Sequence, residues 1–193
     1  MTGLKNFMSV RTPKIPDLSV VVPVKDEAEN LESLIDEICV SLDPSDTEYE
    51  IVYVDDGSED ETSNILKELM SAIPQLRVIR HSNCFGQSAA IVTGVKAARG
   101  GLIATLDGDG QNDPKDISVL LESYRQEKSK PDPGAAMVIG HRVVRKDSLT
   151  KRYSSSIANR IRRILLSDLT PDTGCGLKVF PREVFMKLPH FNH

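Results

Sequence analysis

Short apolar runs alternate along the chain with longer segments in which apolar residues recur every three or four positions. The runs predict buried strands at 18–22, 50–54, 76–79, 102–106 and 136–139. The longer segments predict helices at 27–42, around 65–70, at 87–98 and at 114–127. Strands and helices of these lengths in alternation indicate the α/β fold class, with a mostly parallel, Rossmann-like sheet and helices on both faces.

Individual residues mark the ends of these elements. Pro23 is expected to end the first strand, and Asp26 is expected to cap the helix that follows. Pro114 suits the first turn of the last predicted helix, because the N–H that proline lacks is not needed there. The second helix is expected to turn four apolar residues towards the core: Ile65, Leu66, Leu69 and Met70.

Polar residues directly follow three of the predicted strands, at 23–27, 55–58 and 107–111. Ligands of parallel α/β sheets bind at the carboxyl ends of the strands. The sequence therefore predicts a single cleft to which all three segments contribute.

The segment 107–111 carries the most specific chemistry. Alternate residues of an extended chain point the same way, so Asp107 and Asp109 can converge on one cation beside a polyanionic ligand. Two like charges this close repel each other and persist most readily where a cation neutralises them. Gln111, at the next alternate position, adds a neutral oxygen. The pattern indicates metal-held diphosphate chemistry, with a solvated acidic turn as the alternative.

Other polar residues of the predicted cleft also have simpler explanations. Asp55 and Asp56 precede Gly57, so an Asx turn explains them as well as a carboxylate that binds a base N–H or a ribose hydroxyl. Glu27 suits the first turn of a helix, where the helix dipole favours acids. Gly86–Gln87 suits a turn before a helix.

Length and composition restrict the class of protein. The 193 residues suffice for one α/β domain, which we place at 18–193 after a loose leader at 1–17. With 39% hydrophobic and 27% charged residues, the sequence is typical of a soluble globular protein. Three cysteines lack the spacing of a disulfide framework or a zinc site, which indicates a reducing compartment. No run approaches the roughly 20 apolar residues that span a bilayer.

Several familiar enzyme motifs are absent from the sequence. It contains no Walker A motif, no G-x-G-x-x-G, no H-E-x-x-H and no G-x-S-x-G. These absences argue against P-loop enzymes, Rossmann dehydrogenases, zinc proteases and esterases. Aromatic residues make up 5% of the sequence and tryptophan is absent, so few side chains are present on which nucleic-acid bases could stack. We therefore expect no nucleic-acid partner.

Positive charge is concentrated in one part of the chain. Residues 141–163 contain eight basic residues and one acid, Asp147, which gives a net charge of +7 and leaves −11 for the remainder. Apolar residues at Ile157, Ile161 and 164–165 form a stripe opposite some of these cations. The pattern predicts a basic amphipathic segment that lies on an anionic membrane surface or on a protein surface.

Taken together, the segments 22–27, 54–58, 86–87 and 107–111 resemble family 2 glycosyltransferases of the GT-A fold, over about Leu18–Phe185. The stretch 140–148 with Arg152 and Ser156 is similar to the polyprenyl-phosphate glycosyltransferases, the group with dolichyl-phosphate mannose synthase and undecaprenyl-phosphate aminoarabinose transferases. The resemblance implies inverting transfer of a sugar from a UDP- or GDP-linked donor to a polyprenyl phosphate. It also implies Mg²⁺ or Mn²⁺ as cofactor and a peripheral location at the cytoplasmic face of the membrane.

The resemblance assigns a role to individual residues. Those implied for nucleotide-sugar binding are Pro23, Lys25, Glu27, Val54, Asp56, Asp107, Gly108, Asp109 and Arg142. Those implied for catalysis are Asp107, Asp109 and Arg142, and the implied metal ligands are Asp109 and Gln111. Those implied for the acceptor phosphate are Arg142, Arg152 and Ser156, of which the last two are four residues apart and share a helical face.

Family members continue past the position of His193 with another strand, a basic segment and often membrane-associated helices. We therefore expect the C-terminal part of the catalytic domain to be missing here and the full-length protein to carry a membrane anchor.

Two other interpretations of the function stay open. One is transfer to a saccharide hydroxyl in cell-envelope polysaccharide synthesis, with Asp172 as the general base, and the other is an inactive nucleotide-binding fragment. The sequence also leaves open the nucleotide base and the sugar of the donor, the acceptor lipid, and whether the protein forms homo-oligomers.

Overall fold

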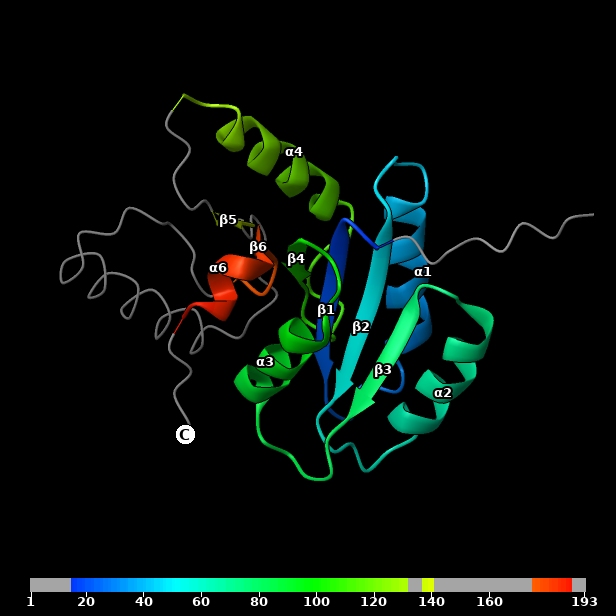
Figure 1. Cartoon of the computed structure of the whole chain (residues 1–193). Coiled ribbons are helices and arrows are strands. Elements are labelled where there is room, and N and C mark those ends of the chain that lie inside the picture. Colours follow the sequence, from blue (N-terminus) through cyan, green and yellow to red (C-terminus); the bar gives the residue numbers. More distant parts are fainter. Residues whose placement is uncertain (1–14, 132–136, 141–174, 189–193) are drawn as a thin grey trace, which may run out of the picture.

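The computed structural model describes residues 15–131, 137–140 and 175–188 (Figure 1). Its strands are Leu18–Val24 (β1), Tyr49–Asp55 (β2), Leu76–Arg80 (β3), Leu102–Thr105 (β4), Val138–Ile139 (β5) and Lys178–Pro181 (β6). Its helices are Leu31–Leu42 (α1), Thr62–Ala72 (α2), Gln87–Ala97 (α3), Asp116–Lys128 (α4) and Arg182–Met186 (α6). The alternation of strands and helices confirms the predicted α/β class.

The strands form one sheet in the order β3-β2-β1-β4-β6-β5. The first four of these are parallel, whereas β6 runs antiparallel to both β4 and β5. The chain moves outward from β1 to β3 and then returns to the other side of β1 with β4, so the topology reverses between β1 and β4. Ligands of open α/β sheets bind at such a switch point.

Helices cover both faces of the sheet, as predicted. Helices α1, α2 and α4 pack on one face, and α3 and α6 pack on the other (Figure 1). Along β1, Val20 and Val22 enter the first of these layers and Val21 enters the second. Because both faces are buried, β1 is apolar at every position except Ser19 and does not alternate between apolar and polar residues.

Pro23 does not end β1, which continues to Val24. The carbonyl of Val21 accepts a hydrogen bond from Leu106 N, and alternate residues of a parallel strand face the same neighbour. Pro23 therefore faces the side of β4, at a level where β4 has already ended. The N–H that proline lacks is not needed at that position.

Three further predictions, about α1 and α2, are wrong. Helix α1 begins at Leu31 rather than near Glu27, and its N-cap is Asn30 rather than Asp26. Asp26 instead adopts a left-handed conformation with φ of 55°, which aspartate tolerates better than most residues, and hydrogen bonds to the loop after β2 hold it there. In α2, Met70 is 44% exposed rather than inward.

Helix α4 begins at Asp116, so Pro114 precedes the helix instead of lying in its first turn. Across the described ranges, no helix combines the length and apolarity needed to cross a membrane.

Candidate functional site

A cleft with a volume of about 420 Å³ opens at the carboxyl ends of β1, β2 and β4, at the switch point of the sheet. All three polar segments singled out in the sequence contribute to it, which confirms the predicted convergence. The lining residues are Pro23, Val24, Lys25, Glu27, Asp56, Cys84, Gly86, Gln87, Ala90, Asp107, Gly108, Asp109 and Gln111.

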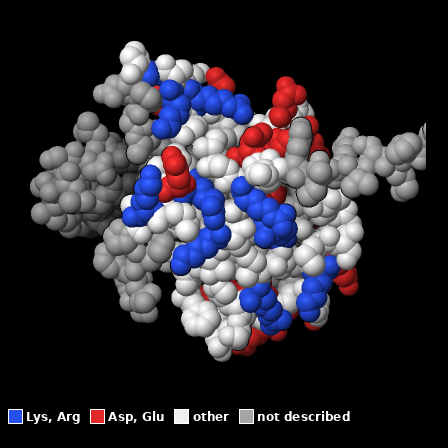
Figure 2. All heavy atoms as spheres, viewed as in Figure 1, with Lys and Arg blue, Asp and Glu red and all other residues white. Residues whose placement is uncertain are grey.

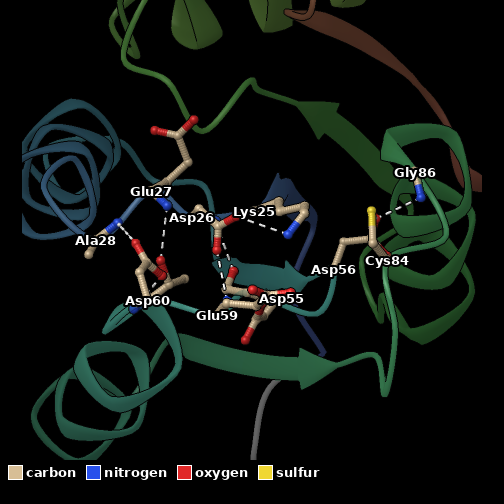
Figure 3. Close-up of polar contacts among 12 residues, drawn as sticks. Lys25, Asp26, Glu27, Ala28, Asp55, Asp56, Glu59, Asp60, Cys84 and Gly86 are labelled. Atoms are coloured by element: carbon tan, nitrogen blue, oxygen red, sulfur yellow. Dashed lines mark hydrogen bonds and ion pairs between the residues drawn. The ribbon is translucent and has the colours of Figure 1, made fainter.

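The loop after β1 is fastened to the loop after β2 (Figure 3). Four hydrogen bonds join them: Asp26 N to Ser58 Oγ (3.0 Å), Glu59 N to Asp26 Oδ1 (2.8 Å), Glu27 N to Thr62 Oγ1 (2.9 Å) and Ala28 N to Asp60 Oδ2 (3.2 Å). Side chains of one loop thus hold backbone groups of the other in both directions. The arrangement fixes the backbone that carries Lys25 and Glu27 at the cleft.

Lys25 forms an ion pair at the rim of the cleft. Its Nζ lies 2.9 Å from Asp26 Oδ2 and donates a hydrogen bond to it. This bond raises the pKa of Lys25 and lowers the pKa of Asp26. Both side chains are exposed, so the pair adds little to folding stability. Its consequence is a lysine that stays cationic where an anionic ligand would enter.

Asp55 has a structural role. It is fully buried, and it accepts hydrogen bonds from Ser58 N (2.8 Å) and from Ser63 Oγ. Arg80 Nε lies 3.5 Å from the same carboxylate. The bond to Ser58 N, three residues on, closes the turn after β2. The turn explanation therefore holds for Asp55.

Asp56 instead faces the cleft and the loop after β3. Its carboxylate accepts hydrogen bonds from Phe85 N (2.9 Å) and Gly86 N (2.7 Å), and the thiol of Cys84 donates to it at 3.3 Å. Nδ1 of His81 lies 2.7 Å away. Burial alone would raise the pKa of Asp56, but the bonds from Phe85, His81, Gly86 and Cys84 outweigh it and hold the pKa below its usual range. Asp56 is thus a firmly held, ionised acceptor.

The acidic pair after β4 is divided between two environments. Asp107 accepts hydrogen bonds from the side-chain amides of Gln87 (2.8 Å) and Asn112 (3.3 Å). Asp109 is exposed and accepts one from Gln111 N (3.1 Å). Asp107 is therefore oriented by its neighbours, whereas Asp109 is directed towards solvent in the cleft.

Two glycines allow the backbone to come close to these groups. A Cβ on Gly108 would collide with Val24 Cγ1, so the loop after β4 lies against β1 only without a side chain there. A Cβ on Gly176 would overlap the carboxylate of Asp107. The segment before β6 therefore returns directly onto Asp107.

The donor set after β4 fits a hard cation. Asp109 and Gln111 supply exposed carboxylate and amide oxygens on one rim of the cleft. Within the described residues, no group of three or more His, Cys, Asp or Glu is arranged to hold a metal ion. Two protein ligands are sufficient in principle, since Mg²⁺ is commonly bound by one or two carboxylates together with waters and substrate phosphates.

The structure does not bring every predicted site residue to the cleft. Val54 is fully buried and packs in the layer beneath α3, so its side chain does not line the cleft. Arg142, Arg152 and Ser156 lie outside the described residues, as do Asp172 and the basic amphipathic segment.

Three residues without a role predicted from the sequence contact a carboxylate of the cleft: His81 and Cys84 contact Asp56, and Asn112 contacts Asp107. His81 and Cys84 follow the end of β3. The strand-end rule that identified the other three segments would have indicated this loop as well.

Comparison with known proteins places the chain among sugar transferases. The model of the family described as Glycosyl transferase family 2 matches residues 19–188. A dodecaprenyl-phosphate galacturonate synthase of Rhizobium johnstonii is 34% identical over 175 residues, which cover 89% of this chain and 50% of that protein. An undecaprenyl-phosphate 4-deoxy-4-formamido-L-arabinose transferase of Edwardsiella ictaluri is 33% identical over 175 residues, covering 90% and 51%. The chain spans about half the length of these relatives.

Solved structures agree on the fold. A mannosyltransferase of Pyrobaculum calidifontis, in complex with GDP-Man and Mn²⁺, superposes with a TM-score of 0.65 at 23% identity, covering 93% of this chain and 48% of that one. The glucosyl-3-phosphoglycerate synthase of Mycobacterium tuberculosis gives 0.66 at 20% identity, covering 90% and 60%. These likenesses confirm the predicted GT-A fold. Since the family model covers most of the sequence, the chain belongs to glycosyl transferase family 2.

Proposed function

We propose that this chain forms the donor-binding part of a glycosyltransferase that moves a sugar from a nucleotide-sugar to a polyprenyl phosphate. The observation that carries the proposal is the meeting of Lys25, Asp56, Asp109 and Gln111 in one cleft at the switch point of the sheet. Two relatives named as polyprenyl-phosphate sugar transferases support the choice of acceptor.

The donor is proposed to lie along the cleft from Asp56 to Asp109. Asp56, beside the loop after β3, would accept a hydrogen bond from an N–H of the nucleotide base or from a hydroxyl of the ribose. Pro23, Lys25 and Glu27 line the cleft from the first loop, and Lys25 supplies positive charge for the diphosphate. Asp107, which Gln87 and Asn112 orient, would face the sugar.

Asp109 and Gln111 would hold the Mg²⁺ or Mn²⁺ ion, because their oxygens are exposed on the same rim. When bound, the ion acts as a Lewis acid that stabilises the charge developing on the departing nucleoside diphosphate. The protein's own contribution is to keep Asp109 exposed next to Asp107, which hydrogen bonds from Gln87 and Asn112 orient.

The acceptor needs placement more than activation. A phosphate monoester is already an anionic nucleophile at neutral pH, so cations that position it replace a general base. The residues proposed for this are Arg142, Arg152 and Ser156. A phosphate oxygen forms the new bond to the anomeric carbon while the bond from that carbon to the diphosphate oxygen breaks. In-line displacement of this kind inverts the anomeric centre.

The acceptor also implies a location. A polyprenyl phosphate resides in a membrane, so we propose that the protein works at the cytoplasmic membrane face, with its basic segment at 141–163 against anionic lipid.

Calorimetric titration tests the donor site. We expect either UDP or GDP to bind the chain in a Mn²⁺-dependent manner, and Asp109→Asn to weaken that binding by about tenfold or more, because a charged ligand of the ion is lost. Asp113→Asn is the matched control: Asp113 lies on the same loop, is exposed and does not line the cleft. The affinity of Asp113→Asn for the nucleotide should equal that of the wild type.

Two results would contradict the proposal. One is that neither nucleotide binds, and the other is that binding is indifferent both to Mn²⁺ and to Asp109→Asn. Nucleotide binding without sugar transfer to a polyprenyl phosphate would instead favour a nucleotide-binding fragment.

A further inference from the structure

His81 links the cleft to the middle of α3. The residue follows β3, and its backbone N–H donates to the carbonyl of Asp55 (2.8 Å). Its ring lies between Asp56 and Thr93 of α3, with Nδ1 2.7 Å from Asp56 Oδ1 and Nε2 2.9 Å from Thr93 Oγ1. The His81 side chain is 13% exposed and that of Asp56 is 5% exposed. Neither His81 nor Thr93 lines the cleft, so both stand behind Asp56.

The bond to Asp56 determines which nitrogen carries the proton when the ring is neutral. The ionised carboxylate of Asp56 can only accept, so Nδ1 carries the proton of that bond. In the neutral ring, Nε2 then accepts the hydroxyl proton of Thr93. Phe85 packs against the same ring, edge to face, with centroids 5.4 Å apart. The ring is therefore fixed by Asp56, Thr93 and Phe85.

On the side of the cleft, Asp56 accepts one weak hydrogen bond, from the thiol of Cys84. Phe85 N, Gly86 N and His81 are strong donors, whereas the thiol of Cys84 is a weak one. Cys84 is exposed and lines the cleft beside Asp56 (Figure 3). A ligand N–H or O–H that replaced the thiol would gain a charge-assisted bond at little cost.

We propose that His81 and Thr93 are a positioning pair that orients the Asp56 carboxylate for a donor group of the nucleoside. This inference rests on the proposed function, because it presumes that a nucleotide occupies the cleft. It adds two residues that act only through Asp56. The alternative is that the pair merely fastens β3 to α3, in which case its loss lowers stability but leaves nucleotide affinity unchanged.

Variants at Thr93 separate the two roles. Thr93→Val removes the hydroxyl with almost no change in shape, whereas Thr93→Ser keeps it. In calorimetric titrations with UDP and GDP in Mn²⁺, we expect Thr93→Val to weaken the nucleotide that the wild type binds by about three- to tenfold. Thr93→Ser should remain within about twofold of the wild type.

Ser63→Ala is the matched control, because Ser63 also donates a hydroxyl to a carboxylate, that of Asp55, which does not line the cleft. We expect it to lower the melting temperature and to leave nucleotide affinity unchanged. If Thr93→Val lowers the melting temperature in the same way without a change in affinity, the positioning role is wrong.

Nitrogen-15 NMR of the imidazoles tests the geometry without a nucleotide. The chain has four histidines, and His81 is assigned by the signal lost in His81→Gln. We expect the neutral ring to carry its proton on Nδ1 in the wild type and in Thr93→Ser, because both keep the bonds of His81 to Asp56 and to the hydroxyl of residue 93. A wild type that shows this tautomer but binds neither UDP nor GDP overturns the proposed function and the positioning role with it. A wild type that binds a nucleotide while the neutral ring of His81 carries its proton on Nε2, and not on Nδ1, overturns the positioning pair alone.

Discussion

Asp55 and Asp56 are neighbours of the same residue type with different roles. Asp55 is the last residue of β2, and its side chain is buried against Ser63 and Arg80. Asp56 follows the strand and turns to the cleft, where the loop after β3 supplies its partners. From the sequence, a turn and a ligand-binding carboxylate explain the pair equally well. The structure supports a turn for Asp55 and a cleft position for Asp56.

The depressed pKa of Asp56 predicts a pH-dependent contribution to stability. The ordinary pKa is 3.8 and the folded value is lower, so the stabilisation is complete above the unfolded pKa and is lost as the pH falls through the folded one. Asp56→Asn should cost about 1–3 kcal/mol at neutral pH, because its amide NH₂ would face the donors Phe85 N and Gly86 N.

Denaturant unfolding of both proteins checks this prediction. The difference in unfolding free energy between wild type and Asp56→Asn should be the same at about pH 7 and pH 5 and should narrow at about pH 3. A difference that stays constant down to the acid limit would show that the carboxylate charge does not stabilise the loop.

Residues at strand ends were predictable, and their partners were not. Asp56, Asp107, Asp109 and Gln111 reach the cleft because each follows a strand of a parallel sheet, which the apolar runs reveal. The bond between Asp56 and His81 joins positions 25 residues apart. No local pattern encodes such a bond. The left-handed conformation of Asp26 has the same origin, because the loop after β2 holds it.

At the scale of elements, one glycine determines how closely α3 approaches the sheet. A Cβ on Gly94 would collide with Val21 Cγ1 of β1 and would lie 3.1 Å from Val54 Cγ2 of β2. Close packing of α3 brings its first residues to the cleft, where Gln87 holds Asp107 and the N-cap Gly86 bonds to Asp56. The helix is therefore a structural link between the sheet and the site.

Gly94→Ala should destabilise the fold. Overpacking costs about 1–3 kcal/mol, and the collision with Val21 Cγ1 places this site in the upper part of that range, at about 2–3 kcal/mol. The better helix propensity of alanine offsets up to about 1 kcal/mol, so we expect the unfolding free energy to fall by about 1–2 kcal/mol. Gly101→Ala is the control, since a Cβ there meets no atom within 4 Å. Chemical denaturation of both variants measures the effect. Equal stabilities would show that α3 shifts without cost.

Elements with strong local patterns were predictable, whereas those that depend on distant contacts were not. The apolar runs of β1, β2 and β4 lie within one residue or two of their predicted positions. Strand β6 was not predicted from the sequence. It is short, and it is defined by antiparallel pairing with β4, about 75 residues earlier in the chain. The start of α1 was misplaced because hydrogen bonds to the loop after β2 keep residues 26–28 out of the helix.

At the scale of the whole molecule, charge is unevenly distributed along the sequence: residues 141–163 carry a net charge of +7, and the rest of the chain carries −11. On the face shown in Figure 2, basic and acidic side chains of the described residues lie in separate small groups, without one continuous basic patch. In the sequence, the eight cations at 141–163 are the most concentrated source of positive charge. A polyanion attracts such a segment more strongly than it attracts the mixed surface.

This division predicts which membranes the protein binds. We expect the chain to sediment with vesicles that contain phosphatidylglycerol and not with vesicles of phosphatidylcholine alone, and to be released as ionic strength rises. Reversing two charges of the segment, Arg160→Glu with Arg163→Glu, should weaken vesicle binding by at least about tenfold, since each basic residue near an anionic surface contributes about 1 kcal/mol. The same reversal at Lys67 and Lys128, which are exposed on α2 and α4, keeps the net charge change equal. If the two double variants lose binding equally, net charge rather than the basic segment governs the association, and the proposed orientation of this segment on the membrane is wrong.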